Sequence, residues 1–82
     1  LQGALEVMLT TIPPGTKSVV FNHSGDELGY VLSGKLHYFV GDQLVVLNTG
    51  DAISHKSNVP HRYENRTKKK VETLWIITPP GF

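Results

Sequence analysis

Apolar and polar residues alternate along most of this chain with the two-residue period of strands that bury one face. In the first such stretch, Leu5, Val7 and Leu9 form the apolar set, which predicts a half-buried strand. No stretch keeps a helical apolar period without an interrupting glycine or proline, so we expect almost no helix. The strands predicted in this way cover residues 5–10, 19–22, 28–32, 36–40, 44–47, 52–54, 60–63 and 71–78.

Turn signals separate these strands at intervals of about ten residues. Pro13, Pro14 and Gly15 end the first strand, because proline removes a donor from the hydrogen-bond ladder and glycine permits a turn. Gly41 and Asp42 lie between two apolar stretches and predict a two-residue hairpin turn. Many short strands with this spacing indicate an all-β fold, either an antiparallel sandwich or a barrel.

Composition narrows the class of protein. The net charge of +1 argues neither for a nucleic-acid surface nor for an acidic partner, and the absence of cysteine excludes disulfides and thiolate metal sites. No apolar run approaches the roughly 18 residues of a membrane helix, and no signal-peptide pattern is present, so we expect a cytoplasmic protein with no membrane partner. The chain of 82 residues starts at Leu1 without an initiator methionine, which suggests one domain from a longer protein. Its small core favours stabilisation by a homodimer or a bound ligand.

Three residues carry chemistry that the strand pattern does not explain. His23 and Glu27 lie four residues apart across a turn, and His61 follows much later in the chain. Imidazole and carboxylate groups suit divalent zinc, iron, nickel or manganese, and two histidines with one carboxylate form known three-ligand sites. The residue types alone leave open the alternative that all three lie on the surface or in hydrogen-bonded positions. A metal site at His23, Glu27 and His61 is therefore a hypothesis at this point.

The spacing of these residues resembles the two motifs of the cupin superfamily. The first motif reads Gly-x5-His-x-His-x3-Glu-x6-Gly, and this chain keeps every interval with Gly15, Phe21, His23, Glu27 and Gly34. The resemblance implies that residues 1–82 form a single cupin domain. Its fold would be all-β, a small antiparallel double-stranded β-helix, which is also called a jelly-roll barrel.

The second cupin motif is matched in the same way. It reads Gly-x5-Pro-x-Gly-x2-His-x3-Asn, and the corresponding residues here are Gly50, Lys56, Asn58, His61 and Asn65. Lys56 and Asn58 depart from it, although asparagine tolerates a positive φ and keeps a turn feasible. Phe21 is the more serious departure, because it stands where the family's first histidine ligand would be. The resemblance implies either a divalent metal held by His23, Glu27 and His61 with water in the open positions, or a polar pocket without metal.

A narrower resemblance concerns function. Residues 23–34, 59–63 and 78–82 are similar to the C-terminal cupin of bacterial transcription regulators, which join a lambda-repressor-type helix-turn-helix to a metabolite-sensing cupin. This implies a small-molecule effector such as a carboxylate or amine, a homodimer, and DNA binding only through a domain outside this chain. The ligand-binding residues expected in the barrel are His23, Glu27, His61, Phe21, Tyr30 and Tyr63.

Two other functions stay open from the sequence. One is a small metal-dependent cupin enzyme of the dioxygenase or isomerase type, and the other is a barrel that serves only for dimerisation. No further acid or base is identifiable, so we assign no catalytic residue. His37 and His55 lie outside both motifs, and we expect them in solvent-exposed or turn positions. Trp75 is expected in the core or on a dimer surface.

Overall fold

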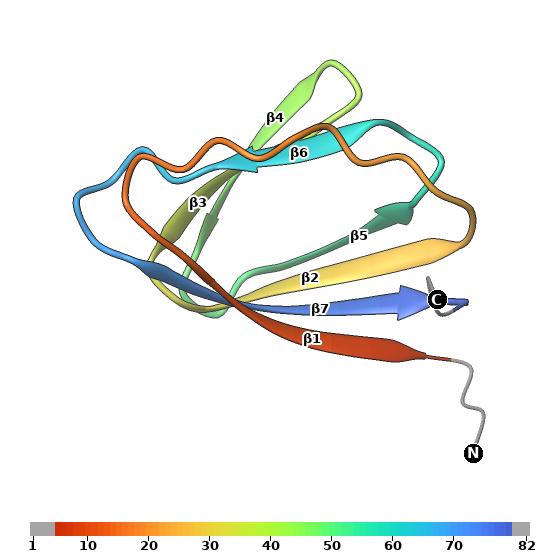
Figure 1. Ribbon diagram of the computed structural model, residues 1–82, viewed down its shortest axis with the longest axis horizontal. Coiled ribbons are helices and arrows are strands. Elements are labelled where there is room, and N and C mark those ends of the chain that lie inside the picture. The colour runs from red at the N-terminus through yellow and green to blue at the C-terminus, as the bar shows by residue number, and fades with distance from the viewer. Residues whose placement is uncertain (1–4, 80–82) are drawn as a thin grey trace.

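The computed structural model describes residues 5–79, and every regular element within this range is a β-strand (Figure 1). These strands are β1 (Glu6–Ile12), β2 (Asp26–Ser33), β3 (Lys35–Val40), β4 (Gln43–Asn48), β5 (Ala52–Lys56), β6 (His61–Glu64) and β7 (Val71–Thr78). The all-β prediction is confirmed. So is the hairpin turn between β3 and β4, where Gly41 has a φ of 59°.

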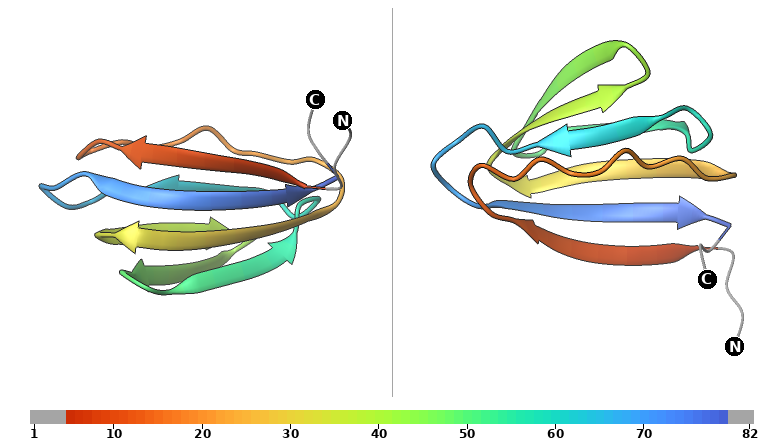
Figure 2. Two further views of the ribbon diagram at one scale, coloured as in Figure 1. Left: turned by 90° about the horizontal axis from the view of Figure 1, so that it is seen from below. Right: turned by 45° about the horizontal axis from the view of Figure 1, so that its top comes forward.

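The strands form two antiparallel sheets that face each other. One sheet has the order β1-β7-β2-β5 and the other the order β4-β3-β6. Figure 1 shows them as a lower and an upper layer, and Figure 2 shows the same layers from two other directions. Neighbouring strands come from distant parts of the chain, as when β7 pairs with both β1 and β2. This is the double-stranded β-helix that the sequence led us to expect.

The segment between β1 and β2 follows β6 without forming a regular strand (Figure 1). It makes isolated bridges from Lys17 to Glu64 and from Phe21 to His61. The prediction of a strand over residues 19–22 is therefore wrong. Val19 and Val20 are exposed, and no continuous ladder covers them, so their β-branched side chains alone do not make a strand.

The apolar core lies between the two sheets. Tyr38 and Trp75 are its large aromatic members, and their rings stack with centroids 5.5 Å apart. Burial of such side chains is the main source of stability in a domain of this size. The buried cluster consists of Ile12, Val31, Leu36, Tyr38, Leu47, Val71 and Trp75.

Strand β1 buries the opposite face from the one that its apolar pattern favoured. Val7 and Leu9 are 59% and 76% exposed, whereas Met8 and Thr10 face the interior. The reason is that Met8 and Thr10, the inner positions of β1 before Ile12, border a cavity, although Met8 also packs against the core. The β1 pattern thus predicted the strand correctly and its buried face wrongly.

Candidate metal centre and ligand cavity

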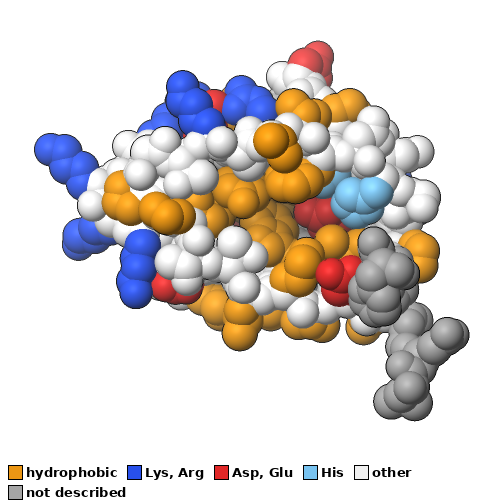
Figure 3. All heavy atoms as spheres, viewed as in Figure 1, with side chains coloured by type: hydrophobic (Ala, Val, Ile, Leu, Met, Phe, Trp, Pro, Cys, Tyr) orange, Lys and Arg blue, Asp and Glu red, His pale blue; other side chains and the backbone are white. Residues whose placement is uncertain are grey.

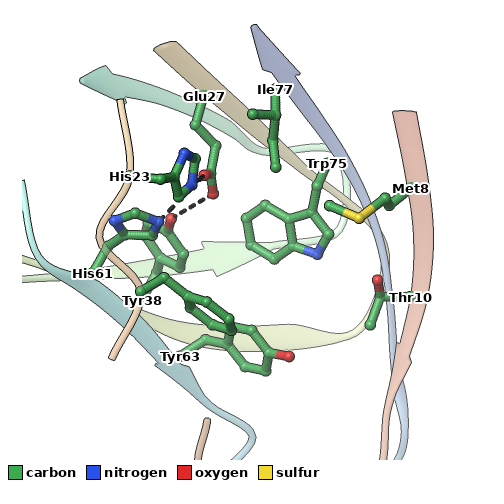
Figure 4. Close-up of a pocket in the computed structure, with 10 residues that line it drawn as sticks. Met8, Thr10, His23, Glu27, Tyr38, His61, Tyr63, Trp75 and Ile77 are labelled. Carbon is green, nitrogen blue, oxygen red and sulfur yellow. Dashed lines mark hydrogen bonds and ion pairs between the residues drawn. The ribbon is translucent and has the colours of Figure 1, made fainter. Parts of the chain in front are cut away.

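His23, Glu27 and His61 come from three different segments and meet inside the barrel (Figure 4). His23 lies in the connection before β2, Glu27 in β2, and His61 at the first position of β6. The Nε2 atoms of His23 and His61 lie 3.1 Å and 3.2 Å from the same oxygen, Oε1 of Glu27. The three ligand atoms lie within 4.8 Å of one another, so a single ion can contact all of them.

A glycine turn brings His23 and Glu27 together. Gly25 has a φ of 99°, and a Cβ atom there would lie 1.9 Å from the carbonyl oxygen of Thr78 in β7. Backbone hydrogen bonds then fix the turn, because the Ser57 N–H donates to Gly25 and the His23 N–H donates to Ser57. A residue with a side chain would be strained in this conformation and would also strike β7.

Backbone carbonyls fix the orientation of both imidazole rings. Nδ1 of His61 lies 2.7 Å from the carbonyl oxygen of Val59, and Nδ1 of His23 lies 3.3 Å from that of Ser24. A carbonyl oxygen only accepts, so each Nδ1 carries the hydrogen, and in the neutral ring each Nε2 offers its lone pair. Both lone pairs point at a carboxylate oxygen that also accepts.

This donor set fits a divalent metal ion. Two imidazole lone pairs and one carboxylate oxygen converge on the same point, and all three are electron-pair donors without a hydrogen between them. A cation bound at this point would satisfy all three at once. Metal-binding histidines usually donate their other ring N–H to a carbonyl or carboxylate, and His23 and His61 both have such a partner. Glu27 is 7% exposed and His61 is 3% exposed, so water would compete little for this carboxylate.

Phe21 forms part of the wall at the position where a further ligand would have been. Its backbone exchanges two hydrogen bonds with His61, of 2.7 Å and 3.0 Å. Its ring stacks on His61 and on Tyr63, with centroids 5.9 Å and 6.2 Å away. Phe21 therefore supplies an apolar surface beside the three-ligand site, and its ring stays 37% exposed at the opening.

A cavity of about 210 Å³ opens next to the three ligand residues. Figure 3 shows it as an orange hollow with the red and pale blue of acidic and histidine side chains at one side. Met8, Tyr63, Trp75 and Ile77 give it an apolar wall, in which Ile77 lies beside Glu27 as its cross-strand partner and Met8 lies across the cavity from it. The complete lining is Met8, Thr10, Phe21, His23, Glu27, Tyr38, His61, Tyr63, Trp75 and Ile77.

The indole of Trp75 lies directly over Gly29, and this sets the depth of the cavity. Gly29 and Trp75 are cross-strand partners in β2 and β7. A Cβ atom on Gly29 would lie 2.3 Å from Cζ3 of Trp75, so the ring occupies the space that any side chain would need. The absence of a side chain at Gly29 thus lets the indole lie back against the sheet.

Tyr38 and His55 form a hydrogen-bonded chain behind Glu27. The Tyr38 hydroxyl lies 3.2 Å from Oε2 of Glu27 and 2.7 Å from Nε2 of His55. Nδ1 of His55 in turn donates to the carbonyl oxygen of Lys56 over 2.8 Å. Burial and the neighbouring Glu27 carboxylate raise the pKa of Tyr38 far above its ordinary value, so its hydroxyl keeps its proton.

Comparison with known proteins places this fold in a family. Residues 8–77 match the family model Cupin_2, whose description is cupin domain. The chain belongs to the Cupin_2 family. The cupin resemblance found in the two motifs is thereby confirmed.

Solved structures share the architecture of this cupin. The Cupin_2 domain of an XRE family transcriptional regulator from Enterobacter cloacae has a TM-score of 0.87 and 21% identity, covering 94% of this chain and 83% of that one. The protein TT1209 from Thermus thermophilus has a TM-score of 0.86 and 26% identity, covering 96% of this chain and 77% of that one.

A curated relative of this cupin is the protein named H2HPP isomerase from Bacillus subtilis. It is 34% identical over 79 residues, which is 93% of this chain. The chain spans 33% of that protein's length, so the match concerns one part of a larger protein. Among residues 5–79 of the cupin there is no helix that could cross a membrane.

The cupin barrel brings together five of the six side chains that were expected to bind a ligand. His23, Glu27, His61, Phe21 and Tyr63 all border the cavity. Tyr30 does not, because it lies three positions after Glu27 in β2 and successive strand residues point to opposite faces. Tyr30 pairs instead with Ala52 and Leu74 on the outer face of the sheet.

Two side chains of the site were missed from the sequence. His55 was expected to be exposed or in a turn, but it lies in β5 as the cross-strand partner of Glu27. The alternation of residue types could have indicated this position, because His55 lies two residues after the apolar Ile53 and therefore on the same face of the strand. In the structure both residues are partly buried, and Ser54 and Lys56 between and after them are exposed. Tyr38 was not among the expected ligand-binding residues, and it is a core residue whose hydroxyl also reaches the site. His37 lies within β3, partly buried, and not in a turn.

Proposed function

We propose that this cupin domain holds a divalent metal ion through His23, Glu27 and His61 and binds a small organic molecule beside it. The observation that carries the proposal is the convergence of two Nε2 atoms on one buried carboxylate oxygen, with each Nδ1 tied to a backbone carbonyl. When bound, the metal would act as a Lewis acid and polarise an oxygen of the ligand. Zinc, iron, nickel and manganese all suit these ligands.

The cavity supports a ligand with an apolar body and one anionic oxygen group. The polar residues His23, Glu27, Tyr38 and His61 gather on one side, where a metal would attract a carboxylate. The rest of the wall is largely aromatic or aliphatic. An apolar cavity of about 150 Å³ suffices for benzene, so a volume of about 210 Å³ accommodates a ring with a short arm.

Metal analysis tests the first part of the proposal. Purified without chelator and loaded with Zn²⁺, the wild-type protein should retain about one ion per chain after gel filtration. Replacement of a ligand by glutamine, in His61→Gln or the less buried His23→Gln, should abolish retention because three ligands are already a minimal set. The control is His37→Gln, which makes the same change in β3 on the outer face. Equal retention by wild type and both ligand variants would show that the ion is not held here.

We further propose that the domain serves as the ligand-sensing part of a bacterial transcription regulator. The support is the similarity of residues 23–34 and 59–63 to the cupins of such regulators, together with a cavity that can enclose an effector. Binding of a small molecule would then shift the population of a domain or dimer arrangement. As probes, benzoate should raise the melting temperature of the Zn²⁺-loaded protein, and acetate at the same concentration should raise it less. Identical shifts would contradict the role of the aromatic wall.

An isomerase is the second candidate, and one observation favours it. Tyr38 and His55 place proton-carrying groups next to Glu27, which an enzyme that moves a proton on its substrate would use. The relative from Bacillus subtilis carries the name isomerase. Incubation of the Zn²⁺-loaded protein with pyruvate in D₂O separates the candidates. Catalysed loss of the methyl proton signal in the NMR spectrum supports an enzyme, whereas binding without exchange supports a sensor.

A further inference from the structure

Glu27 offers two oxygens, and different groups contact each of them. Oε1 faces the two imidazoles, whereas Oε2 faces the hydroxyl of Tyr38 at 3.2 Å. A carboxylate can rotate about its terminal torsion, because such torsions are broad. A partner for Oε2 is therefore what decides whether Oε1 stays between the two Nε2 atoms.

Tyr38 is itself held rigidly from two directions. Its ring is 1% exposed and stacks on Trp75, so the core fixes its position. Its hydroxyl lies 2.7 Å from Nε2 of His55, which is closer than its contact with Glu27. The single hydrogen of the hydroxyl goes to Oε2 of Glu27, so the Tyr38 oxygen accepts from Nε2 of His55, and both ring nitrogens of His55 carry a hydrogen in this arrangement.

His55 anchors this arrangement to the backbone. Its Nδ1 donates to the carbonyl oxygen of Lys56 over 2.8 Å, which fixes the ring and directs Nε2 towards Tyr38. The sheet register explains the placement, because Glu27 and His55 are direct partners across β2 and β5. The edge of the His55 ring also lies against His61, with centroids 4.7 Å apart.

Resting on the metal site proposed above, we propose that Tyr38 and His55 are positioning residues that hold the Glu27 carboxylate in its ligand orientation. Tyr38 acts on Glu27 directly, and His55 acts through Tyr38. His55 is not one of the three residues whose ligand atoms converge, and the Tyr38 hydroxyl bonds to Oε2 of Glu27 and not to Oε1. The role extends the site along a line from the Lys56 carbonyl through His55 and Tyr38 to Glu27.

Metal affinity tests this assignment. Outer partners of metal ligands typically contribute about 10- to 100-fold in affinity. We expect Tyr38→Phe to weaken Co²⁺ binding by about that factor and His55→Leu to weaken it by about 10-fold, measured by titration calorimetry. His55→Gln should bind Co²⁺ more tightly than His55→Leu, since the glutamine side-chain amide can still form a hydrogen bond with the Tyr38 hydroxyl. The matched control is Tyr30→Phe, the same change on the outer face of β2.

A double variant separates positioning from mere packing. Because His55 acts through Tyr38, the Tyr38→Phe/His55→Leu protein should bind Co²⁺ about as weakly as Tyr38→Phe alone. A structural role would lower the melting temperature of the variants and leave the dissociation constant unchanged. Unchanged affinity in Tyr38→Phe, or fully additive losses in the double variant, would overturn the assignment.

A metal-free measurement keeps this inference distinct from the proposed metal site. Crystal structures of metal-free wild type and Tyr38→Phe should show Glu27 in one orientation in the first and displaced or in several orientations in the second. If wild type binds no Co²⁺, the metal proposal is wrong, and these structures then decide the positioning role by themselves. An undisturbed Glu27 in Tyr38→Phe would contradict it.

Discussion

Phe21 shows how one residue changes the chemistry that this barrel can offer. It lies two positions before His23, so both side chains point to the same side of the extended segment and both border the cavity. In place of an imidazole it presents a ring that stacks on His61 and Tyr63. The exchange replaces a possible fourth ligand by an apolar contact surface.

A histidine at this position should restore the missing ligand. We expect Phe21→His to bind Zn²⁺ at least about 10-fold more tightly than wild type, because a fourth protein ligand replaces a bound water. Competition with a chromophoric chelator measures the affinity. Val20→His is the control, since Val20 is exposed and does not border the cavity. An equal gain in both variants would mean that the new imidazole binds metal elsewhere.

At the scale of single strands, one face of β6 lines the cavity and the other face carries a network of charged side chains. His61 and Tyr63 point into the cavity, while Arg62 and Glu64 point outwards. The Glu64 carboxylate accepts hydrogen bonds from both Arg62 and Arg66, and Arg62 lies over the ring of Phe39 at 3.8 Å. This outer network fixes the strand that presents His61.

The network predicts a pH dependence of stability. Hydrogen bonds from Arg62 and Arg66 lower the pKa of Glu64 from 4.5 to about 2. The carboxylate therefore stabilises the fold above the unfolded-state value, and this contribution is lost as the pH falls from about 4.5 to about 2. Urea unfolding across this range should show a smaller decline for Glu64→Gln than for wild type. Parallel curves would show that the network contributes no linkage.

The strands also show what the sequence could and could not predict. The spacing of the glycines, histidines and glutamate matched the cupin motifs, and this resemblance identified the fold and the three candidate ligands. The buried face of β1 was missed, since Met8 and Thr10 border a cavity that no local pattern reveals. His55 was missed because its contact with Tyr38 arises from strand register between distant segments.

The remaining prediction concerns the outer face of the larger sheet. Cross-strand rows join Val7, Ile76 and Leu28, and then Leu9, Leu74 and Tyr30. Val7, Leu9 and Leu28 are among the exposed hydrophobic residues, and none of the six side chains carries a charge. An uncharged apolar face can oppose its own copy across a two-fold axis without like-charge repulsion.

We therefore expect this protein to form a homodimer through that face. Sedimentation velocity should give a mass of twice 9.1 kDa for wild type. Leu9→Asp should shift the protein to monomer, because two like charges would meet or be buried without partners. Val46→Asp places the same change on an exposed position of β4 and should leave the dimer intact. A wild-type monomer, or equal dissociation by both variants, would contradict this interface.

The contact between Gly29 and Trp75 has a consequence for how this barrel can diversify. The indole rests where a methyl group would stand, so a single added carbon behind it would push the ring forward and make the chamber shallower. Ligand size is thus governed from a position that never meets the ligand. Relatives with the same cavity-lining residues can therefore differ in the size of the molecules that they bind through the residue at the position of Gly29, behind the tryptophan ring.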